Sequence, residues 1–460
     1  MKSTQQEIRL RTSLGLQLSA ITGLQILASF GMQWYVVTLL GAGASTDALY
    51  AGAVFPQVAT VLLIESLTSV IVPLLAAMRD EEAEQTTWLL LSSMALVFSA
   101  LTVLLYFSIR WLVPVLVPGF APATKLLAIS LARVQVLGLV FGALTAPLAA
   151  LCQVRSRFRL TALSSLAGLV IGCLILITGL KRFGIEMAAW AQVVATGIPT
   201  LLLLPFAGRM RKVAWRPETM RTIYTRIKPL VWSKGIYMLS IPVDRFLASF
   251  LAPGSVVVLE LANRFYTAVL RVLTQGILTP FLPTLSRYAH ENRWSEFRRV
   301  NRRQVIFMAI PSAVVVVCVA AGSLAVMSWA NMQHGVRVAG NLTADKVGLI
   351  ALVLVYMSGL VPAAACIAAY TSAFFAQGDT RTPARIGVAF FIVGFAFKVI
   401  GFFVGGLKGI AFAVTLWAVG QTVVTAHLLQ RRLEQLTLVE SGKASDSSTP
   451  TEVLGSAATL

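Results

Sequence analysis

Long apolar runs separated by short polar loops make up most of this 460-residue chain. A helix needs about 20 apolar residues to cross a bilayer, and about twelve runs approach or exceed that length. Their approximate limits are 13–40, 47–77, 87–113, 125–150, 160–180, 185–207, 229–251, 256–283, 304–329, 347–376, 385–404 and 409–430. The pattern predicts an all-α integral membrane protein with about twelve transmembrane helices.

Short sequence matches between the two halves of the chain indicate an internal duplication. Residues 40–43 end the first run as residues 251–254 end the seventh, and similar pairs follow in the same order. Because each half holds an even number of spans, the repeats would be parallel. We expect two six-helix lobes related by a pseudo-two-fold axis along the membrane normal. The expected parts are an N-terminal segment at 1–12, an N-lobe at 13–207, a linker at 208–228, a C-lobe at 229–430 and a disordered tail at 431–460.

Composition agrees with a membrane location. Hydrophobic residues make up 57% of the chain and charged residues only 12%, which leaves too little polar surface for a soluble protein of this size. The formal net charge of +19 comes mainly from the loops, where 25 of the 38 Lys and Arg fall on one side of the predicted bundle. By the positive-inside rule both termini are cytoplasmic. Because the excess charge follows membrane topology, we expect no nucleic-acid partner.

Cysteine and histidine residues give no sign of a metal or a cofactor. Four cysteines are scattered through apolar segments without a ligand spacing, and three histidines lie far apart. They are Cys152, Cys173, Cys318, Cys366, His290, His334 and His427. We expect the cysteines to be small buried side chains. The loops are too short to hold a catalytic domain, so a transporter is favoured over an enzyme.

Charged residues within the predicted span 256–283 point to a polar interior. Glu260, Arg264 and Arg271 share one face of a helix, since steps of four and eleven residues return to the same side. A charge at mid-bilayer costs about 2.5–3.5 kcal/mol even on the gentlest scale. These side chains must therefore pair with one another or line a watery cavity.

Other spans contribute further candidates for a cavity lining. Asp47, Arg133, Arg245 and Lys398 are charged residues within or beside apolar runs. Each could equally form a structural ion pair between helices. Asp244 and Glu65 are candidates for coupling-ion binding or for helix pairing, and the sequence does not separate these roles.

The first apolar run carries a polar stripe. Thr22, Gln25, Ser29 and Gln33 recur at helical spacing, either to join helices or to offer hydrogen bonds to sugar hydroxyls. We include Gln25 and Gln33 among the candidates. The embedded charges have a positive excess, and arginine forks match the oxygens of phosphate and diphosphate. The sequence therefore favours an anionic substrate over an organic cation.

Four motifs carry a family resemblance. They are residues 41–48 followed by 55–57, residues 247–255 followed by 262–264, residues 276–286, and residues 377–383. They resemble MurJ/MviN-type lipid flippases of the multidrug/oligosaccharidyl-lipid/polysaccharide exporter superfamily, over most of 10–430. The resemblance implies flipping of a polyprenyl-diphosphate-linked saccharide across the bacterial cytoplasmic (inner) membrane by alternating access. It places Asp47 and Arg264 on charged motif positions, and it adds Asn263, which stands where the family has an aspartate.

The chain also departs from the family pattern. Ile26 and Met32 stand at first-helix positions where the peptidoglycan-precursor flippases carry arginines, and residues 58–61 are uncharged in place of a basic pair. About twelve spans are two fewer than family members usually have. These departures favour a divergent member that carries another lipid-linked glycan.

The expected partners are an anionic lipid-linked glycan, membrane lipids and glycan-synthesis enzymes, and we expect a monomer. Two alternatives stay open. One is an ion-coupled antiporter for drugs or metabolites, with Asp47, Glu65 or Glu260 binding the ion. The other is a non-transporting scaffold for glycan assembly.

Overall fold

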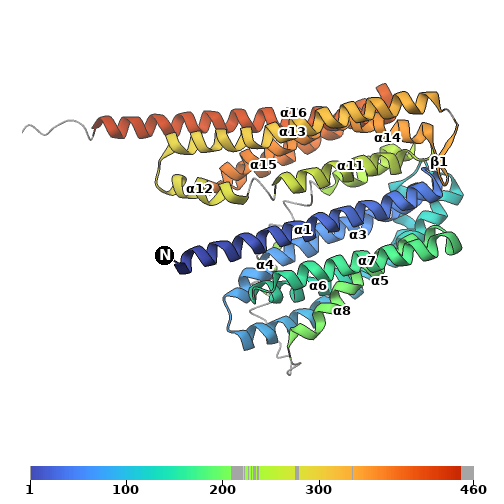
Figure 1. The fold of residues 1–460 in the computed structure, drawn as a ribbon, viewed down its shortest axis with the longest axis horizontal. Helices are drawn as coiled ribbons and strands as arrows, with labels where there is room; N and C mark the ends of the chain where they lie inside the picture. The colour runs from blue at the N-terminus through green and yellow to red at the C-terminus, as the bar shows by residue number, and fades with distance from the viewer. Residues whose placement is uncertain are drawn as a thin grey trace, which may run out of the picture. The chain divides into compact units, whose positions relative to one another are not determined.

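The computed structural model describes residues 2–208, 221–274, 279–333 and 335–446, apart from 222, 226, 229–230, 232–234 and 236–237. Within these residues the chain is almost entirely helical (Figure 1), which confirms the predicted all-α class. By their contacts the residues group into two units. Unit 1 comprises 1–268, 321–357 and 394–413, and unit 2 comprises 269–320, 358–393 and 414–460.

The elements follow the apolar runs closely. The first half contains α1 (Lys2–Leu40), α2 (Ala44–Gly52), α3 (Val54–Ala59), the π-helical turn η1 (Thr60–Ile64), α4 (Glu65–Ala76), α5 (Asp80–Leu116), α6 (Pro122–Val154), α7 (Phe158–Phe183), α8 (Ile185–Leu203) and the 3₁₀ turn η2 (Leu204–Ala207). The second half contains α10 (Ser240–Ser249), α11 (Ser255–Leu273), α12 (Thr279–His290), α13 (Trp294–Met332), the strands β1 (Arg337–Ala339) and β2 (Leu342–Thr343), α14 (Ala344–Met357), α15 (Leu360–Ala376) and α16 (Arg381–Asp446).

Nine helices in the described part of the chain are long and apolar enough to cross a membrane. The predicted seventh span, 229–251, and eighth span, 256–283, fall partly outside the described residues. The predicted eleventh and twelfth spans both lie on α16, where Gly406 has φ +56°, a left-handed conformation that glycine adopts readily. The exact number of twelve and the division into two six-helix lobes stay predictions.

The helix α16 also corrects one boundary. Residues 431–446 continue the helix, so the predicted disordered tail does not begin at 431. The reason is burial, because Leu429 and Leu433 pack with Phe297 and Phe374 in the core of unit 2. In the same unit, Gln304 on α13 donates a hydrogen bond of 3.1 Å from its Nε2 to the hydroxyl of Ser372 on α15.

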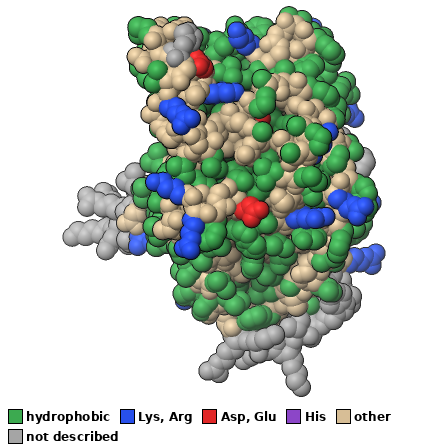
Figure 2. Space-filling model, turned by 90° about the vertical axis from the view of Figure 1, so that its right-hand side faces the viewer, with side chains coloured by type: hydrophobic (Ala, Val, Ile, Leu, Met, Phe, Trp, Pro, Cys, Tyr) green, Lys and Arg blue, Asp and Glu red, His purple; other side chains and the backbone are tan. Residues whose placement is uncertain are grey.

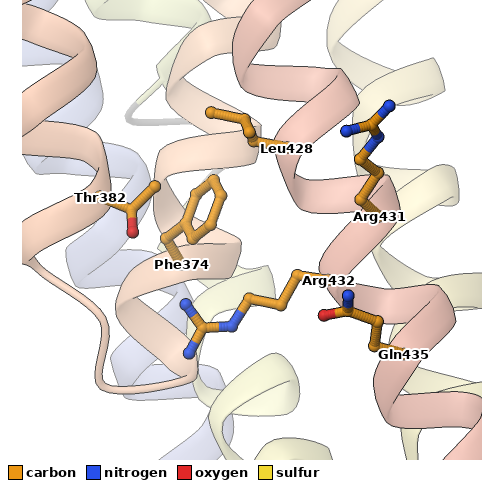
Figure 3. Close-up of a pocket in the computed structure, with 6 residues that line it drawn as sticks. All are labelled: Phe374, Thr382, Leu428, Arg431, Arg432 and Gln435. Atoms are coloured by element: carbon orange, nitrogen blue, oxygen red, sulfur yellow. The ribbon is translucent and has the colours of Figure 1, made fainter.

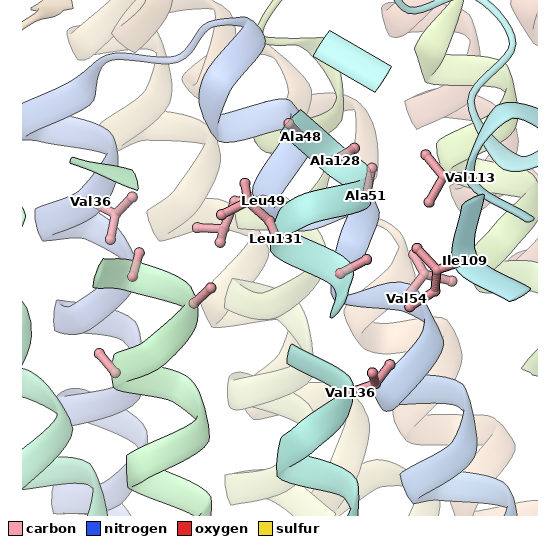
Figure 4. Close-up of a cluster of buried hydrophobic side chains, with 14 of the residues drawn as sticks. Val36, Ala48, Leu49, Ala51, Val54, Ile109, Val113, Ala128, Leu131 and Val136 are labelled. Atoms are coloured by element: carbon pink, nitrogen blue, oxygen red, sulfur yellow. The ribbon is translucent and has the colours of Figure 1, made fainter. Parts of the chain in front are cut away.

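In unit 1, α6 lies at the centre of the packing. Small and branched side chains from α1, α2, α5, α6, α7 and α8 form a buried cluster, part of which appears in Figure 4. The face in Figure 2 is covered largely by hydrophobic side chains. Leu96, Phe403 and Val404 are exposed by 74%, 79% and 83%, as expected for side chains in contact with lipid.

One end of unit 1 joins the two halves of the chain. This end holds the turn between α1 and α2, and we call it the α1–α2 end (residues 38–43). Here the amide of Asn341, at the tip of the β1–β2 hairpin, donates to the carbonyl of Thr38 over 3.0 Å. Nearby, the amide of Gly119 donates to the hydroxyl of Ser249 over 3.3 Å. The first contact joins α1 to the hairpin, and the second joins the turn after α5 to α10.

Candidate functional site

A chain of charged side chains joins α10 and α11 in unit 1. Arg245 on α10 donates to one oxygen of Glu260 on α11, and Arg264, one turn further along α11, donates from Nε to the other oxygen over 2.5 Å. The spacing of four residues places Glu260 and Arg264 on the same face, as the sequence predicts. The triad pairs Glu260 with Arg264, two of the three charges predicted to pair or to line a cavity, whereas the third, Arg271, is exposed.

The triad leaves one positive charge uncompensated, because two guanidinium groups share one carboxylate. Arg245 and Glu260 are sealed, with side chains exposed by 4% and 3%. The side chain of Arg264 is 33% exposed. Its guanidinium carbon lies 5.7 Å from the ring centre of Tyr50 on α2, within the range of a cation–π contact. The surplus charge is therefore presented at Arg264.

Two buried polar atoms beside this triad have no hydrogen-bond partner among the described residues. They are the hydroxyl of Tyr50 and Nε of Arg245. Buried polar atoms in native proteins are nearly always paired with protein, water or ligand. A guanidinium carries five N–H donors, and Arg264 uses only part of its own for Glu260. With the two unpartnered atoms, its remaining donors could bind the oxygens of an anion.

A second buried pair carries no surplus charge. Lys398 on α16 lies 2.6 Å from a carboxylate oxygen of Asp244 on α10, and it donates to the hydroxyl of Ser240 over 2.8 Å. Both charged side chains are nearly inaccessible. This geometry favours the structural alternative for Lys398 and Asp244, which stay untested as substrate or ion ligands.

Asp47 caps the start of α11. Its two carboxylate oxygens accept from the amides of Gly254 and Val257, over 2.6 and 2.8 Å. Negative charge is stabilised at a helix N-terminus by the unsatisfied amides and the helix dipole. Gly254 has φ +97°, which a side-chain-bearing residue rarely adopts. Lys346 on α14 adds a hydrogen bond of 2.6 Å to the carbonyl of Pro253.

Replacing Asp47 by asparagine is expected to lower the free energy of unfolding by about 1–3 kcal/mol, the cost of leaving a buried donor unpaired. An amide has one acceptor oxygen, so either Gly254 or Val257 loses its partner. The measurement is thermal unfolding of the purified protein, with Asp80→Asn as the control because Asp80 is exposed. Equal shifts in the two variants would contradict the capping role.

Two other candidates, Arg133 and Gln25, donate hydrogen bonds to backbone carbonyls of neighbouring helices. Arg133 contacts α5, donating from Nε to the carbonyl of Tyr106 over 3.3 Å. Gln25 joins α1 to α7 through a hydrogen bond of 2.7 Å from Nε2 to the carbonyl of Ala162. These contacts favour helix pairing for both, and their roles in a cavity stay predictions.

The remaining candidates have varied surroundings. Gln33 is buried, and its Oε1 has no partner in the described part of the chain. Glu65 is exposed at the start of α4, directly after the π-helical turn. Asn263 is half-buried beside Arg264, and Arg271 is exposed on the last turn of α11, in unit 2.

Sequence reasoning missed Tyr50 and Lys346. Tyr50 follows Asp47 by three residues, so helical spacing could have placed both on one face of α2. Lys346 lies just before the predicted span 347–376, and no signal in the sequence links it to Pro253.

Solved structures share this architecture. A lipid II flippase MurJ in an inward closed conformation matches with a TM-score of 0.76 and 15% identity, over 92% of this chain and 90% of that chain. An inward-facing multidrug resistance MATE family transporter of the MOP superfamily matches with a TM-score of 0.73 and 14% identity, over 91% and 95%. The fold is therefore that of polytopic membrane transporters in this class.

Sequence comparison narrows the class to one family. A family model described as "Lipid II flippase MurJ" matches residues 36–459. The lipid II flippase MurJ of Burkholderia cenocepacia is 24% identical over 82% of this chain and 76% of that protein. A probable lipid II flippase MurJ of Rhizobium tropici is 24% identical over 84% and 74%. The chain belongs to the MurJ family of lipid flippases, which confirms the resemblance and makes it a transporter rather than an enzyme.

Proposed function

We propose that this protein flips a polyprenyl-diphosphate-linked saccharide across the bacterial cytoplasmic membrane by alternating access, with both termini in the cytoplasm. The observation that carries the proposal is the uncompensated positive charge of the Arg245–Glu260–Arg264 triad, presented at Arg264. A diphosphate offers several anionic oxygens in one small group. A guanidinium fork binds such oxygens with directed, charge-assisted hydrogen bonds.

The surroundings of Arg264 suit a headgroup better than a free ion. The ring of Tyr50 lies against one side of the guanidinium. Its hydroxyl, which has no partner among the described residues, could donate to a phosphate or accept from a sugar. Glu260 holds Arg264 in place without cancelling the second arginine. The saccharide would bind near these groups, while the polyprenyl tail stays in lipid.

Contacts at the α1–α2 end support a gate. With the N-terminus in the cytoplasm, the end of α1 lies at the opposite face of the membrane. There Asp47 binds the start of α11, and the β1–β2 hairpin binds α1. These hydrogen bonds would keep that face closed, and substrate release on that side would require breaking them.

The identity of the saccharide follows less directly. The named relatives are lipid II flippases. In this chain Met32 is buried with Val36 in the apolar core of unit 1, so the first helix offers no cation at that position. We propose that recognition rests mainly on the diphosphate at Arg264. The sugar carried would then need no cationic partner at Ile26 or Met32.

The test is flipping in proteoliposomes. Arg264→Ala is expected to lower the flipping rate of a fluorescent lipid-linked saccharide by about 10- to 100-fold, the loss of a charge-assisted contact worth about 1.5–3 kcal/mol. Arg264→Lys should be intermediate, because lysine keeps the charge but lacks the fork. Arg110→Ala is the matched control, an exposed arginine stacked on Trp111 at the end of α5. Lipid II and a second polyprenyl-diphosphate glycan are supplied in separate arms.

A normal rate for Arg264→Ala, at equal protein per vesicle, would contradict the site. Loss of folding without a separate transport defect would favour the scaffold alternative. Flipping of neither lipid by the unaltered protein, with cation-driven efflux of a drug instead, would favour the antiporter.

A further inference from the structure

An open surface cavity of about 390 Å³ lies in unit 2, where α15 meets the start of α16 and residues 428–435 of the same helix. It is lined by Phe374, Thr382, Leu428, Arg431, Arg432 and Gln435 (Figure 3). Its size falls within the range of pockets that bind small ligands, about 300–1,000 Å³. None of the residues proposed above to bind substrate lines this cavity.

The cavity is built on a fixed polar frame. Asp379 caps α16, accepting from the amides of Arg381 and Thr382 over 3.0 Å each, and from the Thr382 hydroxyl over 2.7 Å. Arg432 donates to the same carboxylate. Burial acts to raise the pKa of Asp379, but these hydrogen bonds outweigh it and lower the pKa to about 2. Asp379 therefore stays ionised at neutral pH and holds Arg432 at the cavity.

Charge at the cavity is positive overall. Arg432 is matched by Asp379, whereas Arg431 is exposed and has no ion pair among the described residues. Glu434, three residues further along α16, lies 3.9 Å from Arg298 in a long, exposed ion pair. Arg431 thus contributes a net positive charge beside the free donors of Arg432 and the amide of Gln435.

The rest of the lining is apolar, and further apolar side chains are exposed on α15 and α16. Phe374 forms a buried floor. Leu428 and Val424, one turn apart on α16, are exposed, and so is Phe375 on α15. An apolar surface that leads from a basic pocket along a membrane helix matches the shape of a phospholipid, with phosphate at one end and acyl chains at the other.

From this arrangement we propose that the cavity binds the phosphate of an anionic phospholipid headgroup, with its acyl chains along Val424 and Leu428. The site goes beyond the proposed transport function and would anchor the end of α16 to the membrane surface. Only its placement in the cytoplasmic leaflet depends on the orientation proposed above. A phospholipid headgroup and a free phosphate anion both present a phosphate to these side chains, so the experiment must distinguish the two ligands.

The experiment uses the purified full chain in mild detergent, stripped of lipid. Phosphatidylglycerol and phosphatidylethanolamine with the same acyl chains are added at equal concentrations, and bound lipid is counted by native mass spectrometry. We expect phosphatidylglycerol to be retained preferentially. Arg431→Gln and the isosteric Gln435→Glu should each lower its retention about fivefold or more.

Arg287→Gln is the control, because Arg287 is an exposed arginine of unit 2 outside the cavity. Equal retention of both lipids, or retention unchanged in both cavity variants, would overturn the proposal. Displacement of the lipid by an equal concentration of glycerol phosphate would assign the cavity to a free anion instead. Each result is read without a transport assay, so it stands apart from the test at Arg264.

Discussion

Glu260→Gln is expected to destabilise the protein by about 3–5 kcal/mol, because it leaves Arg245 buried beside a neutral group. Arg245 is 4% exposed, and its Nε has no partner in the part of the chain that the structure describes, so no water-accessible position is open to its charge. The expected result is a large fall in the thermal unfolding temperature and in the yield of monodisperse protein. Glu434→Gln is the control, since Glu434 is exposed and its ion pair with Arg298 is long.

A double variant separates charge from packing. Replacing a buried ion pair by apolar groups of similar size is often neutral, so Arg245→Met together with Glu260→Gln should recover much of the lost stability. The free energy of unfolding of both single variants and the double variant gives the coupling between the two residues. Additive effects, with no recovery, would show that Arg245 and Glu260 do not depend on each other.

Joining Thr38 to Asn341 covalently is expected to abolish flipping. The 3.0 Å hydrogen bond between their backbones makes the two residues direct neighbours, as a disulfide between introduced cysteines requires. Thr38→Cys and Asn341→Cys are combined in a protein whose four native cysteines are replaced by alanine. If the α1–α2 end must open for release, oxidation should stop transport and reduction should restore it.

Each single-cysteine variant controls for the substitutions themselves. Gel mobility after proteolysis between the two positions reports the fraction cross-linked. A fully cross-linked protein that flips at the rate of the reduced protein would mean that this end does not open during transport.

Much of the fold follows from the sequence because lipid offers backbone groups no hydrogen bonds. Apolar runs in a bilayer must therefore be helical. The predicted span 125–150 lies within α6 (Pro122–Val154), and 160–180 lies within α7 (Phe158–Phe183). A helix extends beyond its predicted apolar run where residues in the flanking polar segment are also buried. The start of α13 at Trp294, well before the predicted 304, is an example, since Phe297 is buried.

The candidate site was less accessible to sequence reasoning, because partners on different helices leave no local pattern. The pairing of Glu260 with Arg264 follows from a step of four residues, and the structure contains it. That Arg245 takes the other oxygen of Glu260, and that Lys398 pairs with Asp244, depends on how helices distant in sequence pack. From the sequence one can predict that such buried charges need partners, but not which residues the partners are.

Binding of a polyprenyl diphosphate to the purified protein tests the central claim most directly. The account predicts saturable binding that inorganic diphosphate competes away, that Arg264→Ala weakens by about tenfold or more, and that Arg110→Ala leaves unchanged. Equal affinity in the unaltered protein and Arg264→Ala would contradict the claim that this guanidinium holds the diphosphate.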